Sequence, residues 1–312
     1  MIPRPSLILF CIVLVACKPQ SGDIRSEGGP LKETRHDTVI VLASNYPLFF
    51  FAQEIAGNAG GIEIGLPAMT GDPAEWKPDA DAIIELQNAD LILLNGAGYE
   101  SWLSWVTLSA DRLLDTTETI TDQLISLSGD ALHQHGPTGE HSHQGVAFTV
   151  WLDPALAIRQ AQLIQQSLSS LLPRQAEVFA ANLDQLTDRL HDLDRKLKTA
   201  FAGFDKQKII FSHPVYQYLQ ARYNLDGASL HWEPGEAPGP SDWIDLIDLL
   251  GRHDASLMLW EDTPLDETTQ RLLQSGIRSI SFQTGSGQPA TGDYFSVMNS
   301  NLEQLNGITA EP

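Results

Sequence analysis

The sequence predicts an α/β fold in which two parallel-sheet lobes are joined by one long helix, with a ligand cleft between the lobes. Short apolar runs alternate with helical segments in both halves of the 312-residue chain, which is the pattern of parallel sheets covered by helices. Between the halves, residues 173–202 keep apolar residues at helical spacing over about 45 Å. A helix of that length exceeds one small lobe, so we expect it to connect two.

Residues 1–17 predict a lipoprotein signal peptide. Arg4 lies in a short polar start, and Leu7–Val15 is an apolar run too short to span a bilayer. The run ends in Leu14-Val15-Ala16-Cys17, which resembles the bacterial lipobox. We therefore expect Cys17 to carry the lipid that anchors the protein to a membrane, on its periplasmic or extracytoplasmic face. An ordinary signal peptide with an incidental cysteine is the alternative interpretation.

The next segment, residues 18–37, predicts a flexible tether because it is polar and lacks apolar periodicity. The N-terminal lobe is expected over residues 38–172. Asp153 and Pro154 suit the N-cap and first position of a helix that runs to about residue 172. The other elements expected in this lobe are strands at 39–43, 62–66 and 91–94 and helices at 48–56 and 79–88.

The C-terminal lobe is expected over residues 203–312, where the same alternation resumes. Its expected strands are 208–211, 228–231, 257–260 and 279–282. Its expected helices are 215–223, 243–250, 265–274 and 295–305.

Composition narrows the function classes. The formal charge of −21 disfavours binding to nucleic acid, although solubility alone would also account for it. The two cysteines are Cys11, which leaves with the signal peptide, and Cys17. The body therefore has neither disulfide nor thiolate, and any metal site in it must use histidine, aspartate and glutamate.

Four candidate metal ligands lie at the ends of predicted strands or in the segments that follow them. Open α/β sheets bind ligands at the carboxyl ends of their strands. Read in this way, the sequence points to Glu75, His213, His231 and Glu261. Two imidazoles and two carboxylates suit Zn²⁺ or Mn²⁺. The alternative is that these residues have purely structural roles.

A second group of histidines lies in a predicted loop at residues 130–145. It consists of His133, His135, His141 and His143. We expect this loop to collect metal loosely and to exchange it fast, because a mobile segment loses conformational entropy with each ion that orders it. An accidental polar loop is the alternative.

No enzyme constellation competes with metal binding. Ser212 and His213 are adjacent in sequence, which does not place a serine hydroxyl on an imidazole as a catalytic triad requires. Gly285-Ser286-Gly287 follows a late strand without a P-loop helix, and the chain lacks a His-Glu-x-x-His pattern. We therefore do not expect catalysis.

Five segments, in the same order, resemble the substrate-binding lipoproteins of bacterial zinc and manganese ABC transporters. They are Ala43-Ser44-Asn45-Tyr46-Pro47-Leu48, Gly71-Asp72-Pro73-Ala74-Glu75-Trp76-Lys77-Pro78, Ala89-Asp90-Leu91-Ile92-Leu93-Leu94-Asn95-Gly96-Ala97-Gly98-Tyr99-Glu100, Trp151-Leu152-Asp153-Pro154 and Ser212-His213-Pro214-Val215-Tyr216. The resemblance covers about residues 38–305. It implies two α/β lobes linked by a rigid helix, with the metal between them.

Three of the four ligand positions that the resemblance implies hold other residues. Ala74 and Thr149 stand where histidines are expected, and Gln283 stands where an aspartate is expected. His213 matches. Either metal binding has been lost, or the site has been rebuilt from other residues.

We therefore expect a lipid-anchored, monomeric receptor that captures a divalent cation, zinc first and manganese next, and delivers it to an ABC permease. One rival is a degenerate homologue that serves as an accessory or interaction lipoprotein without a tight metal site. A second rival is a receptor of the same fold for a different ligand.

Overall fold

The computed structural model describes residues 38–69, 73–127, 132–135, 139–142, 145–204 and 207–309. The predictions for the signal peptide at residues 1–17, the lipidated Cys17, the tether at 18–37 and His143 concern residues outside this part of the chain. Within the part described, no helix combines the length and apolar character needed to cross a bilayer.

Four parallel strands form the N-terminal sheet in the order β2-β1-β3-β4. They are β1 (Val39–Ala43), β2 (Ile62–Gly65), β3 (Leu91–Leu94) and β4 (Leu113–Asp115). All four residues of β3 are buried, as expected of a parallel strand that is covered on both faces.

A second sheet of four parallel strands has the order β10-β9-β7-β8. Its strands are β7 (Lys208–Phe211), β8 (Asp226–Ser229), β9 (Leu257–Trp260) and β10 (Arg278–Ser281). Two parallel sheets with intervening helices confirm the predicted fold class.

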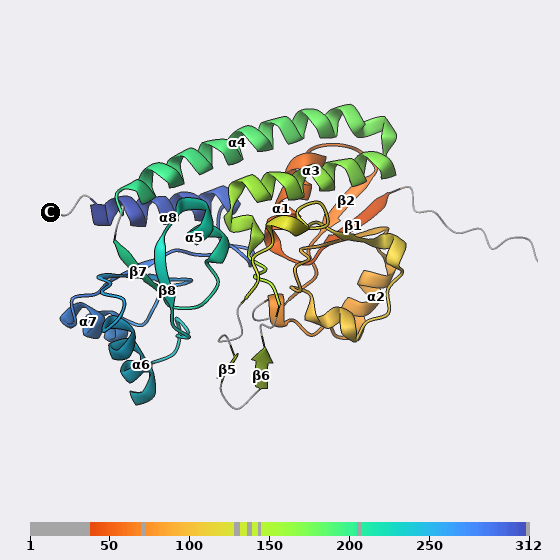
Figure 1. The fold of residues 1–312 in the computed structure, drawn as a ribbon. Helices are drawn as coiled ribbons and strands as arrows, with labels where there is room; N and C mark the ends of the chain where they lie inside the picture. The colour runs from red at the N-terminus through yellow and green to blue at the C-terminus, as the bar shows by residue number, and fades with distance from the viewer. Residues whose placement is uncertain are drawn as a thin grey trace, which may run out of the picture. The chain divides into compact units, whose positions relative to one another are not determined.

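In the part of the chain that the structure describes, eight α-helices accompany the sheets. Figure 1 shows their arrangement. They are α1 (Tyr46–Ala56), α2 (Ala80–Asn88), α3 (Pro154–Leu171), α4 (Ala176–Ala202), α5 (Gln217–Tyr223), α6 (Pro240–Leu250), α7 (Asp266–Gln274) and α8 (Tyr294–Thr309). Asp153 caps α3 as predicted, since its side chain accepts a hydrogen bond from the Ala155 N–H at 2.8 Å. We call β1–β4 with α1–α3 the N-terminal lobe, and β7–β10 with α5–α8 the C-terminal lobe.

Helix α4 connects the two lobes. Its 27 residues correspond to about 40 Å, and it packs against α1 and α3 on one side of the junction and α5 and α8 on the other (Figure 1). Leu186, Leu190, Leu193 and Leu197 form its buried stripe. They belong to a single hydrophobic core that also contains Val41 of β1 and Leu259 of β9. The lobes therefore share one core.

Two differences from the predicted secondary structure concern the candidate metal ligands. Strand β8 was predicted at 228–231, but it pairs with β7 over Asp226–Ser229, so His231 lies beyond its end. The predicted loop at 130–145 contains an antiparallel hairpin of β5 (Leu132–His135) and β6 (Gly139–Ser142), in whose register His133 is opposite His141. Short-range patterns do not specify strand pairing, which explains both differences.

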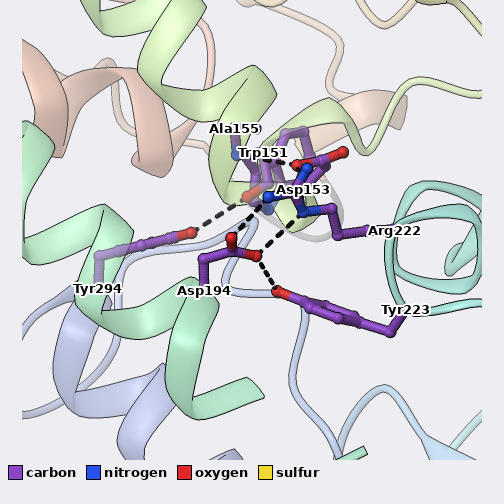
Figure 2. Close-up of polar contacts among 7 residues, drawn as sticks. All are labelled: Trp151, Asp153, Ala155, Asp194, Arg222, Tyr223 and Tyr294. Atoms are coloured by element: carbon purple, nitrogen blue, oxygen red, sulfur yellow. Dashed lines mark hydrogen bonds and ion pairs between the residues drawn. The ribbon is translucent and has the colours of Figure 1, made fainter. Parts of the chain in front are cut away.

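A charged network ties α4 to both lobes (Figure 2). Arg222 donates two hydrogen bonds to Asp194 of α4, at 3.0 and 2.5 Å, and its Nε lies 3.5 Å from Asp153 Oδ1. Tyr223 donates a third hydrogen bond to Asp194 at 3.0 Å. Burial acts to raise the pKa of Asp194, but the hydrogen bonds from Arg222 and Tyr223 outweigh it and lower the pKa overall.

A buried carboxylate organises the strand ends of the N-terminal sheet. Glu100 accepts hydrogen bonds from Ser44 Oγ at 2.5 Å, the Asn95 N–H at 2.6 Å and the Gly96 N–H at 3.2 Å. A glycine is needed at position 96, since its φ is +79° and a Cβ there would lie 1.9 Å from Asp115 Oδ1. Burial raises the pKa of Glu100 to about 7 against the opposing effect of these hydrogen bonds.

This carboxyl group should make the stability of the protein fall between pH 4.5 and pH 7. The unfolded chain ionises Glu100 near its ordinary pKa of 4.5, whereas the folded protein keeps the proton up to about pH 7. The free energy of unfolding should therefore decrease by up to about 3 kcal/mol as pH rises through this window, and then level off. Urea denaturation of wild type and Glu100→Gln at several pH values measures the effect.

The informative quantity is the slope of the free energy of unfolding against pH. In Glu100→Gln the amide NH₂ faces the Gly96 N–H, which lowers stability equally at every pH and does not contribute to this slope. The variant should show a flatter pH dependence than wild type. The matched control is Glu118→Gln, which removes an exposed carboxylate and should keep the wild-type slope. Parallel pH profiles for wild type and Glu100→Gln would contradict the assignment.

Candidate metal centre

The candidate centre begins at the carboxyl end of β7, an interior strand of the C-terminal sheet. Ser212 and His213 follow the buried residues Ile209–Phe211. The Ser212 N–H donates to Leu259 O of β9 at 2.8 Å, and Ser212 O accepts from the Trp232 N–H at 2.7 Å. Backbone pairing thus continues past β7 on both sides and holds the chain in place up to His213.

Register brings Glu261 to the same level as His213. Phe211 pairs with Leu259, so the residues two positions further along, His213 and Glu261, come next to each other. The distance from His213 Nδ1 to Glu261 Oε1 is 4.0 Å. Both side chains are largely buried, with 13% and 23% of their surface exposed.

A carboxylate that was not predicted as a ligand lies closer to His213 than that of Glu261 does. Glu233 Oε1 lies 3.4 Å from His213 Nδ1. The predicted strand ends at His231, so the sequence indicates His231 as the ligand of this segment. Because β8 ends at Ser229, the following segment is a loop. In this loop the Glu233 side chain lies beside His213. The spacing of two residues after His231 was the signal that could have found it.

Trp232 holds this loop in place. It is buried, and its ring lies 4.9 Å from that of Trp243 and 6.0 Å from that of Trp260, between centroids. With the indole in the core and the backbone N–H bonded to Ser212, the next residue along the chain comes out beside His213. The apolar packing of Trp232 therefore positions the candidate ligand Glu233.

Together, His213, Glu233 and Glu261 offer one ligand atom each, and these atoms lie within 4.8 Å of one another. Ligand atoms about 2.0–2.1 Å from a tetrahedral zinc ion are about 3.4 Å apart. The contact between His213 and Glu233 already has this length, and the contact with Glu261 is slightly longer. One imidazole and two carboxylates form a donor set suited to zinc or manganese.

The fourth neighbour is His231. Its ring is T-shaped against that of His213, with 5.7 Å between centroids. It packs against His213 but is not part of the group of three.

The electrostatic environment favours a cation. Tyr216 follows His213 by three residues and donates a hydrogen bond to Phe282 O at 2.5 Å. Burial raises its pKa well above the ordinary value, and the negative charges of Glu261 and Asp262 raise it further. Two carboxylates, Glu233 and Glu261, share the partly buried centre with His213, and a divalent ion there would offset their mutual repulsion.

The predicted ligand Glu75 and the substituted positions Thr149 and Gln283 are not part of this group of three. Glu75 ends a short 3₁₀ helix of the N-terminal lobe, η1 (Pro73–Glu75). Thr149 Oγ1 donates to Val215 O at 2.5 Å. Gln283 Nε2 donates to Asp262 Oδ1 at 3.1 Å. Two of the substituted ligand positions therefore carry hydrogen bonds.

Comparison with known proteins identifies the family. The family described as "Zinc-uptake complex component A periplasmic" matches residues 41–307. The chain belongs to this family. The match covers both lobes and the helix between them, so the resemblance read from five short segments is confirmed.

Two relatives illustrate the range of the family. The zinc-binding lipoprotein AdcA of Streptococcus pneumoniae (strain ATCC BAA-255 / R6) is 24% identical over 96% of this chain, which spans 59% of that relative's length. The high-affinity zinc uptake system protein ZnuA of Bacillus subtilis (strain 168) is 23% identical over 96% of this chain and 95% of its own. The chain thus spans nearly the full length of the second relative and little more than half of the first.

A solved structure agrees with the fold. The Zn(II)-bound ZnuA-like domain of Streptococcus pneumoniae AdcA superposes with a TM-score of 0.70 at 21% identity, over 88% of this chain and 100% of that domain. At this identity the likeness establishes the shared architecture. The choice of His213, Glu233 and Glu261 as candidate ligands rests on the geometry of this chain alone.

Proposed function

We propose that this protein is an extracytoplasmic, lipid-anchored solute-binding protein that captures a divalent metal ion and delivers it to an ABC permease. The observation that carries the proposal is the convergence of His213, Glu233 and Glu261 within 4.8 Å at the end of one sheet. Membership of a zinc-uptake family supports zinc as the preferred ion. Manganese is the second candidate, because a donor set rich in carboxylates also suits it.

The mechanism needs no catalytic step. The three side chains bind the ion by replacing its water, and the surrounding carboxylates favour its capture from dilute solution. Docking on the permease would release the ion through movement of the loops that follow β7, β8 and β9. We propose that the protein acts as a monomer at the outer face of a membrane.

A second candidate function is an accessory lipoprotein without a tight metal site. The substitutions Ala74, Thr149 and Gln283 favour it, because each removes a ligand that the resemblance implies. The two functions differ in metal stoichiometry. The solute-binding protein should retain one tightly bound zinc ion per chain after gel filtration, whereas the accessory protein should retain none.

The histidine hairpin provides the first test. Deletion of residues 132–144 should lower the total amount of bound zinc and leave one tight event, because the hairpin collects ions only loosely. Titration calorimetry on wild type and the deletion variant measures both quantities. Loss of the tight event on deletion would place the principal site in the hairpin instead of at His213.

The anchor provides the second test. Cys17→Ser should move the protein from the membrane fraction to the soluble fraction or leave it unprocessed, because the acyl chains attach at this residue. Fractionation followed by mass spectrometry of the N-terminus measures the outcome. Cys11→Ser is the matched control and should leave anchoring intact. Unchanged membrane association of Cys17→Ser would exclude the lipoprotein assignment.

A further inference from the structure

The side chains of the candidate centre all come from one lobe. His213 follows β7, Glu233 follows β8 and Glu261 follows β9, and these strands are neighbours in the C-terminal sheet. The nearby imidazole of His231 belongs to the same lobe. A complete metal site can therefore be assembled without any residue of the N-terminal lobe.

Outside the histidine hairpin, the opposite lobe has few residues that could bind the ion. Residues 38–127 and 145–172 contain no histidine. Polar groups at the strand ends of this lobe form hydrogen bonds within the lobe. Glu100 accepts from Ser44, Asn95 and Gly96. Asn95 Nδ2 donates to Phe148 O at 2.8 Å. Thr116 Oγ1, after β4, accepts from Gln160 Nε2 at 2.8 Å.

Asp115 is an acidic residue at the end of strand β4. Its Oδ1 accepts from the N–H and the hydroxyl of Thr117, at 2.8 and 2.7 Å. Of the four residues predicted as ligands of the cleft, only Glu75 belongs to this lobe.

Direct hydrogen bonds hold the lobes together. Thr149 donates to Val215 O at 2.5 Å, two residues after His213. Trp151 Nε1 donates to Thr284 O at 2.8 Å, and Tyr294 OH donates to Trp151 O at 3.1 Å. Trp151 and Tyr294 are fully buried, so these bonds lie inside the shared core and are strengthened by exclusion of water. None of them involves the candidate ligands.

We infer that the metal ion is held by the C-terminal lobe alone, and that the N-terminal lobe is fixed beside it by hydrogen bonds that do not depend on the ion. This inference rests on the proposed function and specifies how the ion is held. Its consequence is that loading and release change only the loops after β7, β8 and β9. The junction at Thr149 and Trp151 keeps the same arrangement in the metal-free and metal-bound protein.

Two matched substitutions test which lobe supplies ligands. Glu233→Gln and Glu75→Gln each replace one carboxylate by an amide of the same shape, one in each lobe. Zinc titration calorimetry should show Kd increased by about 10–100-fold for Glu233→Gln and changed less than about 2-fold for Glu75→Gln. A loss of 10-fold or more in Glu75→Gln would overturn the inference. Circular dichroism confirms that both variants are folded.

Hydrogen exchange provides a second measurement on the unmodified protein. Saturating zinc should slow exchange of amides in 207–215, 228–236 and 257–263, because bound ligand suppresses local opening where it binds. Amides in 145–153 should exchange at the same rate with and without zinc. Zinc-dependent protection of 145–153 would show that the ion couples the lobes.

The outcomes separate this inference from the proposed function. A wild type that shows no tight zinc event overturns the proposed function, and the inference with it. Tight binding that depends on Glu75, or that protects residues 145–153, leaves the proposed function intact and overturns only the assignment to one lobe.

Discussion

His213→Ala should abolish tight zinc binding, with Kd raised by at least about 100-fold. The imidazole is the one group of the centre that contacts both carboxylates, at 3.4 Å from Glu233 and 4.0 Å from Glu261. Its removal leaves two carboxylates without a nitrogen donor. Since loss of even an outer-shell partner typically costs about 10–100-fold in metal affinity, loss of a direct ligand should cost more. Competition against a zinc chelator measures the change.

The same variant should lose its stabilisation by zinc. A ligand that binds only the folded state, at 100 times its Kd, stabilises that state by about 2.7 kcal/mol, so zinc should raise the Tm of the wild type and leave that of His213→Ala unchanged. His191→Ala is the matched control, because His191 is an exposed histidine of α4. A His213→Ala protein that binds zinc as tightly as wild type would exclude the centre and favour the accessory lipoprotein.

Arg222→Met should lower the free energy of unfolding by about 2 kcal/mol. The guanidinium bonds Asp194 twice and approaches Asp153, and these carboxylates keep only 18% and 15% of their side-chain surface exposed. Removal of one partner from a buried ion pair costs about 3–5 kcal/mol, and the partial exposure of Arg222 reduces this figure. Urea denaturation at neutral pH measures the loss.

Arg195→Met provides the comparison. Arg195 pairs with Asp192 on the same helix, but its side chain is 70% exposed, and such surface pairs contribute about 0.2–1 kcal/mol. A small effect at Arg195 and a large one at Arg222 would identify burial as the cause. Equal effects would mean that the network at the junction adds no more than a surface pair. Neither substitution touches the metal centre, so zinc affinity should be unchanged in both.

Most of the secondary structure could be predicted because its signals are local. The apolar runs 91–94 and 257–260 are the strands β3 and β9, and Asp153-Pro154 begins α3 as expected. The errors fall where local signals are weak. Strand β8, with the sequence Asp-Gly-Ala-Ser, has no apolar pattern, so its position depends on pairing with β7.

The short strand β4 was missed for a related reason. Its three residues, Leu113–Asp115, pair only with β3, at the edge of the N-terminal sheet. A strand of this length contains too few residues for a periodic pattern to stand out from the surrounding turns.

The sequence by itself determined the fold class and the family, since periodicity and short motifs lie within continuous stretches of chain. It also placed His213 and Glu261 at strand ends, because this follows from where apolar runs stop. Only the tertiary structure decided that Glu233 joins them, since its position depends on the anchoring of Trp232 among Trp243 and Trp260. The role of Thr149 at the junction likewise depends on a carbonyl 66 positions further along the chain. Contacts between distant segments depend on packing and register, which no local pattern encodes.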